Sequence, residues 1–335
     1  MTHKSATKKK APSRFVIGLT IFTVIAFGLY TVFWFMGART IKKSVVAFVE
    51  EQRAAGSVLT HGAIKSEGFP FLLRTRIDDI DWQIPDAGQW RADALYIDAL
   101  PYAFDRVIFS PQGTQSLSVP TLAAPYQNWT GSGETIRASI GRDAHTGWAF
   151  ILELKTLLLA ANANPARLTL ADLIVNIHPD QSDGDTLLLT ALSGDLQWTE
   201  GQAKARLTAV ELEAALTDYL TLDLEAPQVW ADNGGMIRLD RLRIADDPAQ
   251  LTATGRLGLD PAGQPRGQIE TVLEKPAPFL ETMTSLGLID TDNRAAISGG
   301  LAMASLAGGG RIKSVFMIEK GAVLMDGVPL GERAP

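Results

Sequence analysis

The chain has 335 residues, 46% of them hydrophobic and 20% charged, a composition typical of a folded protein that carries one additional apolar segment. It contains no cysteine, which excludes disulfides, thiolate metal sites, iron–sulfur clusters and a cysteine nucleophile. The net charge is −6 overall but −12 over residues 40–335, where 37 acidic residues outnumber 25 basic ones, so the basic surface that nucleic-acid binding requires is missing and we expect no nucleic-acid partner.

The N-terminus combines a basic tail with a long apolar run. Residues 1–14 contain basic residues and no acidic one, and residues 15–38 contain no charged residue. A helix needs about 20 apolar residues to cross the hydrocarbon core of a bilayer, whereas the apolar region of a signal peptide is usually about 7–15 residues long. We therefore expect an uncleaved transmembrane helix at 15–38, with a long cleaved signal peptide as the alternative.

The basic residues set the expected orientation. More of them precede the span than follow it closely, so the positive-inside rule keeps residues 1–14 in the cytoplasm and exports the domain that follows. Aromatic side chains are common where a helix meets the membrane interface. We assign the membrane anchor to Phe15, Tyr30, Trp34 and Phe35.

The chain after the span reads as a short helix and then as a β domain. Apolar residues at helical spacing predict a helix at 39–56, either a stalk or a helix packed on the domain, and Gly56 ends the pattern. Within 57–335, alternating runs bounded by Gly, Pro, Asn and Asp predict strands. Two late segments, 276–286 and 294–307, have helical patterns and precede a closing hairpin. The expected fold class is mainly β with a few helices (α+β), built on a large antiparallel sheet that is curved or groove-like.

Four of the alternating runs share an irregularity. Each skips one residue and then resumes on the opposite phase, between Ala92 and Leu95, Leu170 and Leu173, Ala209 and Leu212, and Leu239 and Leu242. An extra residue in one strand makes a β-bulge, which bends the strand and re-aims its side chains. The pattern predicts bulges at these positions; chance recurrence in an apolar chain is the alternative.

Residue patterns that would indicate catalysis are missing. No two of the four histidines lie three or four residues apart, which argues against a zinc hydrolase site, and the G-x-S-x-G elbow does not occur. The acidic residues at 78–81 fit the solvent face of a strand, and those at 180–185 miss the spacing of a calcium loop and fit a turn. We expect no enzymatic activity, no cofactor and no metal.

Aromatic residues are the candidates for ligand contact. The segment 68–71, Gly-Phe-Pro-Phe, places a proline in an apolar stretch, which suggests the edge or start of a strand because proline cannot donate to the ladder. We assign a lipid-binding or groove role to Phe69, Phe71, Trp82 and Trp90, with filling of the core as the alternative for each.

The order of these features resembles a known family. The basic tail, the span, Gly-Phe-Pro-Phe followed by RTRIDDIDW, the later LTATGRLGLDPAGQPRGQIE, the helix ending in SLGLI and the terminal VLMDGVPLG resemble the proteobacterial domain of unknown function 2125 (DUF2125). The C-terminal layout is similar to AsmA-like envelope proteins. That second resemblance implies a β-rich groove, lipid movement and outer-membrane assembly.

These resemblances lead to one preferred hypothesis and two alternatives. The preferred one is a single-pass protein of the bacterial inner membrane whose periplasmic domain binds or shields phospholipid in envelope maintenance, with the lipid bilayer and envelope-assembly proteins as partners. The alternatives are a ligand-free periplasmic scaffold or interaction module, and an envelope hydrolase. An apolar sheet face that is open to solvent would favour the first, because covering that face would turn it into an ordinary core.

Overall fold

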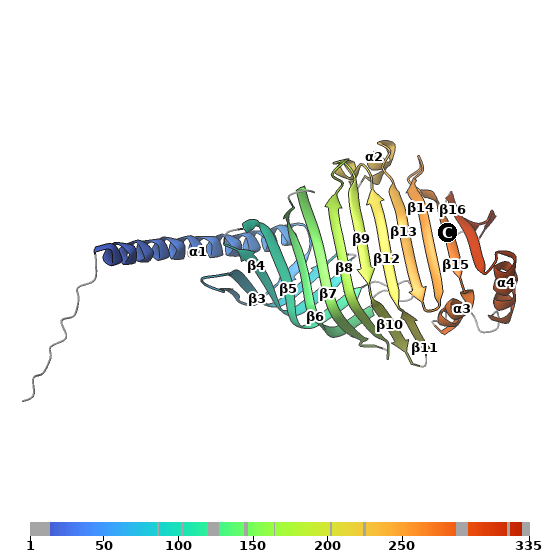
Figure 1. The fold of residues 1–335 in the computed structure, drawn as a ribbon, viewed down its shortest axis with the longest axis horizontal. Helices are drawn as coiled ribbons and strands as arrows, with labels where there is room; N and C mark the ends of the chain where they lie inside the picture. The colour runs from blue at the N-terminus through green and yellow to red at the C-terminus, as the bar shows by residue number, and fades with distance from the viewer. Residues whose placement is uncertain are drawn as a thin grey trace, which may run out of the picture.

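The structure is a computed structural model that describes residues 14–85, 87–101, 103–119, 127–143, 147–163, 165–201, 203–223, 226–285, 294–319 and 322–329. The predicted cytoplasmic tail lies outside the described residues, apart from Arg14. A long helix at the N-terminal end is followed by a large antiparallel sheet with short helices at its margins (Figure 1). The expected fold class is therefore confirmed.

The sheet has eighteen strands within the described residues. Its first half comprises β1 Val58–Thr60, β2 Ile64–Glu67, β3 Leu73–Ile84, β4 Gly88–Leu100, β5 Ala103–Val119, β6 Gln127–Asp143, β7 Gly147–Ala161, β8 Arg167–Pro179 and β9 Leu187–Ser193. Its second half comprises β10 Asp195–Glu200, β11 Ala203–Leu207, β12 Ala209–Leu216, β13 Ile237–Asp246, β14 Ala249–Leu259, β15 Pro265–Glu274, β16 Arg311–Glu319, β17 Ala322–Met325 and β18 Val328–Pro329.

Most strands pair with their neighbours in sequence. β1 and β2 pair with separate halves of β3, and the order then runs from β3 to β8. β8 pairs with both β9 and β10, which follow one another along β8 and are separated only by Gly194. β9 continues to β12, and the order then runs from β13 to β18. Because most strands pair with a neighbour in sequence, the sheet extends in one direction away from its first strands (Figure 1).

Helix α1, Arg14–Ala54, is continuous over 41 residues and is therefore about 60 Å long. The predicted span at 15–38 and the predicted helix at 39–56 are two parts of this one helix. Its N-terminal part projects beyond the sheet, whereas its C-terminal part lies along the first strands (Figure 1). The helix is long and apolar enough to cross a membrane.

A line of bulges crosses the first half of the sheet. Asp79 on β3, Thr135 on β6 and Asp172 on β8 have positive φ angles of 50°, 53° and 52°. The β4–β5 register shifts between Ala92 and Ala94. Bulges bend strands and increase their twist, so this line curves the sheet around the face that α1 occupies.

Three of the four predicted irregularities coincide with these features. The register shift at Ala92, the positive φ at Asp172 and the register shift between Leu239 and Leu242 confirm the bulge prediction there. In the fourth run, the strand is interrupted between β11 and β12. The register shift follows Glu213, later in the chain than the sequence pattern indicated.

Short helices complete the margins of the sheet. A 3-10 turn, η1 Tyr219–Thr221, and α2 Pro227–Asp232 join β12 to β13. Near the C-terminus, α3 Pro276–Ser285 and α4 Arg294–Ala307 confirm the two predicted late helices. Phe279 and Leu280 of α3 are buried, and α3 contacts β11 and β14. α3 and α4 lie at the end of the sheet opposite α1 (Figure 1).

We expect Leu73→Ala to lower the free energy of unfolding by about 2–5 kcal/mol, because it leaves a cavity in a packed core. Leu73 is 1% exposed and packs with Trp34 and Ala38 of α1. Denaturant unfolding of the intact chain in detergent micelles measures the change. Leu158→Ala is the matched control, since Leu158 is 51% exposed. Equal losses in the two variants would contradict the assigned packing of α1 on β3.

Candidate functional site

An apolar groove of about 670 Å³ lies between the C-terminal half of α1 and strands β3 to β6. Its volume is within the range of about 300–1,000 Å³ that is usual for ligand pockets. The side chains that line it are Thr40, Ile41, Ser44, Val45, Phe48, Val49, Leu59, His61, Ile77, Ile80, Trp82, Trp90, Leu95, Ile97, Ala99, Val107, Phe109, Pro111, Ile136 and Ala138. Nearly all of these are apolar, so the groove suits a hydrocarbon ligand.

The helical and strand periodicities bring these side chains together. Ile41, Val45 and Phe48 recur every three or four residues, which places them on one face of α1. That face is turned to the sheet, where the Phe48 ring meets the Trp82 ring edge-on with the centroids 5.8 Å apart. Below Trp82, the bulge at Asp79 lets both Ile77 and Ile80 face α1. A strand with strict alternation would have turned one of the two isoleucines to the opposite face.

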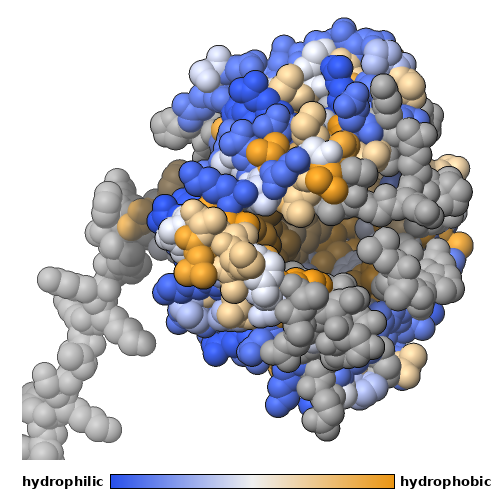
Figure 2. Space-filling view, turned by 90° about the vertical axis from the view of Figure 1, so that its right-hand side faces the viewer, coloured by the Kyte–Doolittle hydropathy of each residue, from blue (hydrophilic) through white to orange (hydrophobic). Residues whose placement is uncertain are grey.

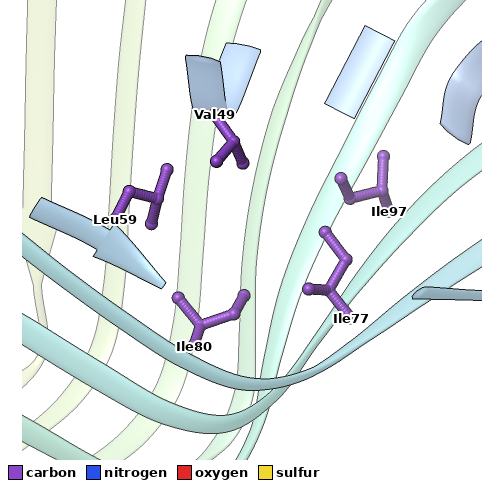
Figure 3. Close-up of a cluster of buried hydrophobic side chains, with 5 residues drawn as sticks. All are labelled: Val49, Leu59, Ile77, Ile80 and Ile97. Atoms are coloured by element: carbon purple, nitrogen blue, oxygen red, sulfur yellow. The ribbon is translucent and has the colours of Figure 1, made fainter. Parts of the chain in front are cut away.

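A buried cluster holds the end of α1 on the sheet. Val49, Leu59, Ile77, Ile80 and Ile97 come from α1, β1, β3 and β4 and point toward one another (Figure 3). Next to this cluster, the guanidinium of Arg53 donates hydrogen bonds of 2.9 and 2.6 Å to the Leu59 carbonyl oxygen. α1 is therefore fixed over the first strands at its C-terminal end.

The apolar face continues across the sheet beyond α1. Directly opposed residues of antiparallel neighbours lie on the same face, so the register identifies a row that crosses the sheet. That row runs through Leu73, Ala99, Val107, Ile140, Phe150, Ile177, Leu189, Ala214, Leu239, Gly255, Ile269, Phe316 and Met325. It contains no polar side chain. From β3 to β16 it covers roughly 50 Å at the usual spacing of about 4.8 Å between strands.

Much of this row is open to solvent. Phe150, Ile177, Leu189 and Leu239 are half-buried, and Ile140 is exposed. Seen from the side of the C-terminal strands, the molecule has a hollow lined by hydrophobic residues within a mostly hydrophilic exterior (Figure 2). We call this concave apolar surface, together with the groove, the trough.

The convex face of the sheet carries ion pairs. Arg74 donates two hydrogen bonds of 2.7 Å to the Asp98 carboxylate, which raise the pKa of Arg74. Hydrogen bonds from Lys65 and then Arg76 lower the pKa of Asp78. The Asp78 carboxylate therefore stays ionised at neutral pH, and the outer face is polar. Among the described residues, no group of three His, Asp or Glu side chains is placed to hold a metal ion.

Two of the four aromatic residues predicted for the groove line it. Trp82 and Trp90 are in the groove, and Trp90 Nε1 donates a 3.0 Å hydrogen bond to Gln115 Oε1. Trp82 Nε1 is buried without a hydrogen-bond partner within the described part of the chain. Phe69 and Phe71 lie outside the groove, on the turn that joins β2 to β3, where Phe71 is 83% exposed. The sequence pattern indicated the edge or start of a strand. It could not show that this segment forms a turn packed against α1.

The aromatic anchor residues meet that turn. Phe35 is exposed and Trp34 is 2% exposed, and their rings lie 6.2 and 5.4 Å from that of Phe69. The Tyr30 hydroxyl donates a hydrogen bond to the Pro70 carbonyl oxygen. The side chain of Phe15 lies outside the described side chains. An interfacial role for these residues stays a prediction, and the structure adds contacts between the apolar part of α1 and the β2–β3 turn.

Comparison with known proteins identifies a family. A model of the family described as "Uncharacterized protein conserved in bacteria (DUF2125)" matches residues 34–334. No curated protein and no solved structure matches the chain.

We expect Ala138→Trp to weaken the binding of a hydrophobic fluorescent probe such as N-phenyl-1-naphthylamine by about tenfold or more, about 1.4 kcal/mol. The added indole would fill part of the groove at β6. Fluorescence titration of the intact chain in a nonfluorescent detergent measures this binding. Ser139→Trp is the matched control, because the next residue on a strand points to the opposite face. Equal affinities in the two variants would contradict binding in the groove.

Proposed function

The chain belongs to the DUF2125 family of uncharacterised bacterial proteins, and we propose that it is a membrane-anchored lipid-binding protein whose trough shields the acyl chains of phospholipids. In this proposal α1 crosses the bacterial inner membrane once, with residues 1–14 in the cytoplasm and the sheet in the periplasm. The function served is maintenance of the cell envelope.

The observation that carries the proposal is the unbroken apolar row on the concave face. A fully packed domain would cover such a face with helices or a second sheet. Here α1 covers the first strands and α3 contacts β11 and β14, while the middle of the row stays half-buried. A long open apolar surface of this kind marks a site for an apolar ligand or partner.

The free energy available from acyl-chain burial is large enough for stable binding. Each methylene transferred from water contributes about 0.8 kcal/mol, so twelve methylenes supply about 10 kcal/mol. Association and ordering of a flexible chain offset several kcal/mol of this. A single acyl chain in the trough would therefore be held reversibly, as shielding or transfer requires.

Polar atoms at the groove fit the polar end of a lipid. Trp82 Nε1 is a buried donor that lacks a partner within the described residues, and an ester carbonyl oxygen of a phospholipid would supply an acceptor. His61 and Thr40 also line the groove. We assign these groups to binding and no residue to catalysis, since the ionised side chains described above lie in ion pairs on the convex face.

We expect the intact chain, extracted in a mild detergent, to retain phospholipid in near-stoichiometric amount. Val175→Glu should reduce this amount severalfold, because it places a charge on the apolar face next to the long row, opposite Leu152 and Ala191. Native mass spectrometry, followed by extraction and identification of the lipid, measures the occupancy.

The matched control is Asn176→Glu, one residue along β8 on the opposite face, where Asn176 contacts Thr190. This variant should retain the lipid of the unmodified chain. A monodisperse unmodified chain without lipid would contradict the proposal and would favour the scaffold or interaction module. Crosslinking to envelope-assembly proteins would then be the informative measurement.

A further inference from the structure

The β2–β3 turn, residues 68–72, packs against the part of α1 that is expected to lie in the membrane. The Phe69 ring lies 6.0 Å from the ring of Phe27 and also contacts Trp34 and Phe35. The turn thus follows the helix back from the sheet toward its N-terminus. Phe71, at the tip, is 83% exposed.

The length of α1 decides on which side of the membrane surface this turn lies. The charge-free helix begins at Phe15, and from there to Phe27 it extends only about 20 Å at 1.5 Å per residue. The hydrocarbon core is about 30 Å thick. A helix that crosses the whole core must therefore use residues beyond Phe27, and these are the residues that the turn covers.

We propose that the β2–β3 turn is inserted in the bilayer beside α1, in the leaflet nearest the sheet, as a second membrane-embedded element. This inference rests on the part of the proposed function that makes α1 a membrane span. The lipid acyl chains are the partner, and the exposed Phe71 ring contacts them.

The chemistry of the turn agrees with this placement. Backbone polar groups inside hydrocarbon must be satisfied within the protein. The Pro70 carbonyl oxygen accepts from Tyr30, the Leu72 carbonyl oxygen accepts a 3.1 Å hydrogen bond from Trp34 Nε1, and the Gly68 carbonyl oxygen accepts a 2.9 Å bond from the Leu72 amide. Pro70 has no amide hydrogen to satisfy.

Charged residues mark where the insertion ends. The segment from Gly68 to Leu73 contains no charged side chain, whereas Glu67 and Arg74, which pair across β2 and β3, flank it on both sides. Arg39 follows the uncharged part of α1. Charged side chains are unfavourable in hydrocarbon and settle at the interface, so these three residues place the membrane surface at the base of the turn.

Depth-dependent fluorescence quenching tests the inference on the full-length chain. Because the chain has no cysteine, Phe71→Cys creates a single site for a bimane label. The chain is reconstituted into vesicles of phosphatidylcholine and phosphatidylglycerol that contain acyl-chain spin-labelled lipid. We expect strong quenching and a blue-shifted emission at position 71. Because the Phe71 side chain is 83% exposed, its replacement leaves the core undisturbed.

Two control sites make the outcomes distinguishable. Leu29→Cys lies on the exposed surface of α1 and reports insertion of the helix, and Ala262→Cys lies on the exposed turn between β14 and β15 and reports solvent. Quenching at 71 that matches position 29 supports the inference. Quenching at 29 alone overturns the inserted turn and leaves the anchor intact. Weak quenching at both positions overturns the inserted turn together with the membrane anchor.

Discussion

The packing of α1 on the concave face is the contact on which the rest of the structure depends. The apolar side chains of the first strands need a cover, and Val49 and its neighbours on α1 provide it. The same contact creates the groove, because the facing side chains of α1 and of the first strands line it. Farther along the sheet, no helix of the described residues covers the same apolar face over the middle strands, and the groove opens into the rest of the trough.

Curvature makes the face a trough instead of a flat surface. Bulges at Asp79, Thr135 and Asp172 lie on successive parts of the sheet, and each re-aims the strand beyond it. Asp93 stabilises the irregularity in β5 by accepting a 2.7 Å hydrogen bond from the Thr114 amide. Two of the three positive-φ bulge residues are aspartates, which tolerate this conformation better than most side chains. The acidic residues in the strands thus serve the shape of the sheet.

Local pattern was enough to predict the class of fold, the long apolar helix near the N-terminus, the late helices and most of the bulges, because each follows from spacing within a few residues. Trp82 and Trp90 were assigned to the groove from residue type alone, and the structure places both there. The contacts of Phe69 depend on residues about forty positions earlier, on α1, so no local pattern could show them. Likewise, the exposure of the concave apolar face depends on which strands the helices pack against, and this is a tertiary contact that local pattern does not show.

α1 passes from its exposed N-terminal part to the sheet without a break, and the β2–β3 turn fixes it a second time along its length. Two separate attachments leave little freedom for the sheet to swing about the helix. If α1 spans a bilayer as proposed, its angle to the membrane therefore sets the angle of the whole sheet. Since a helix adjusts its tilt to bilayer thickness, a thinner or thicker membrane would change the direction in which the far end of the trough points.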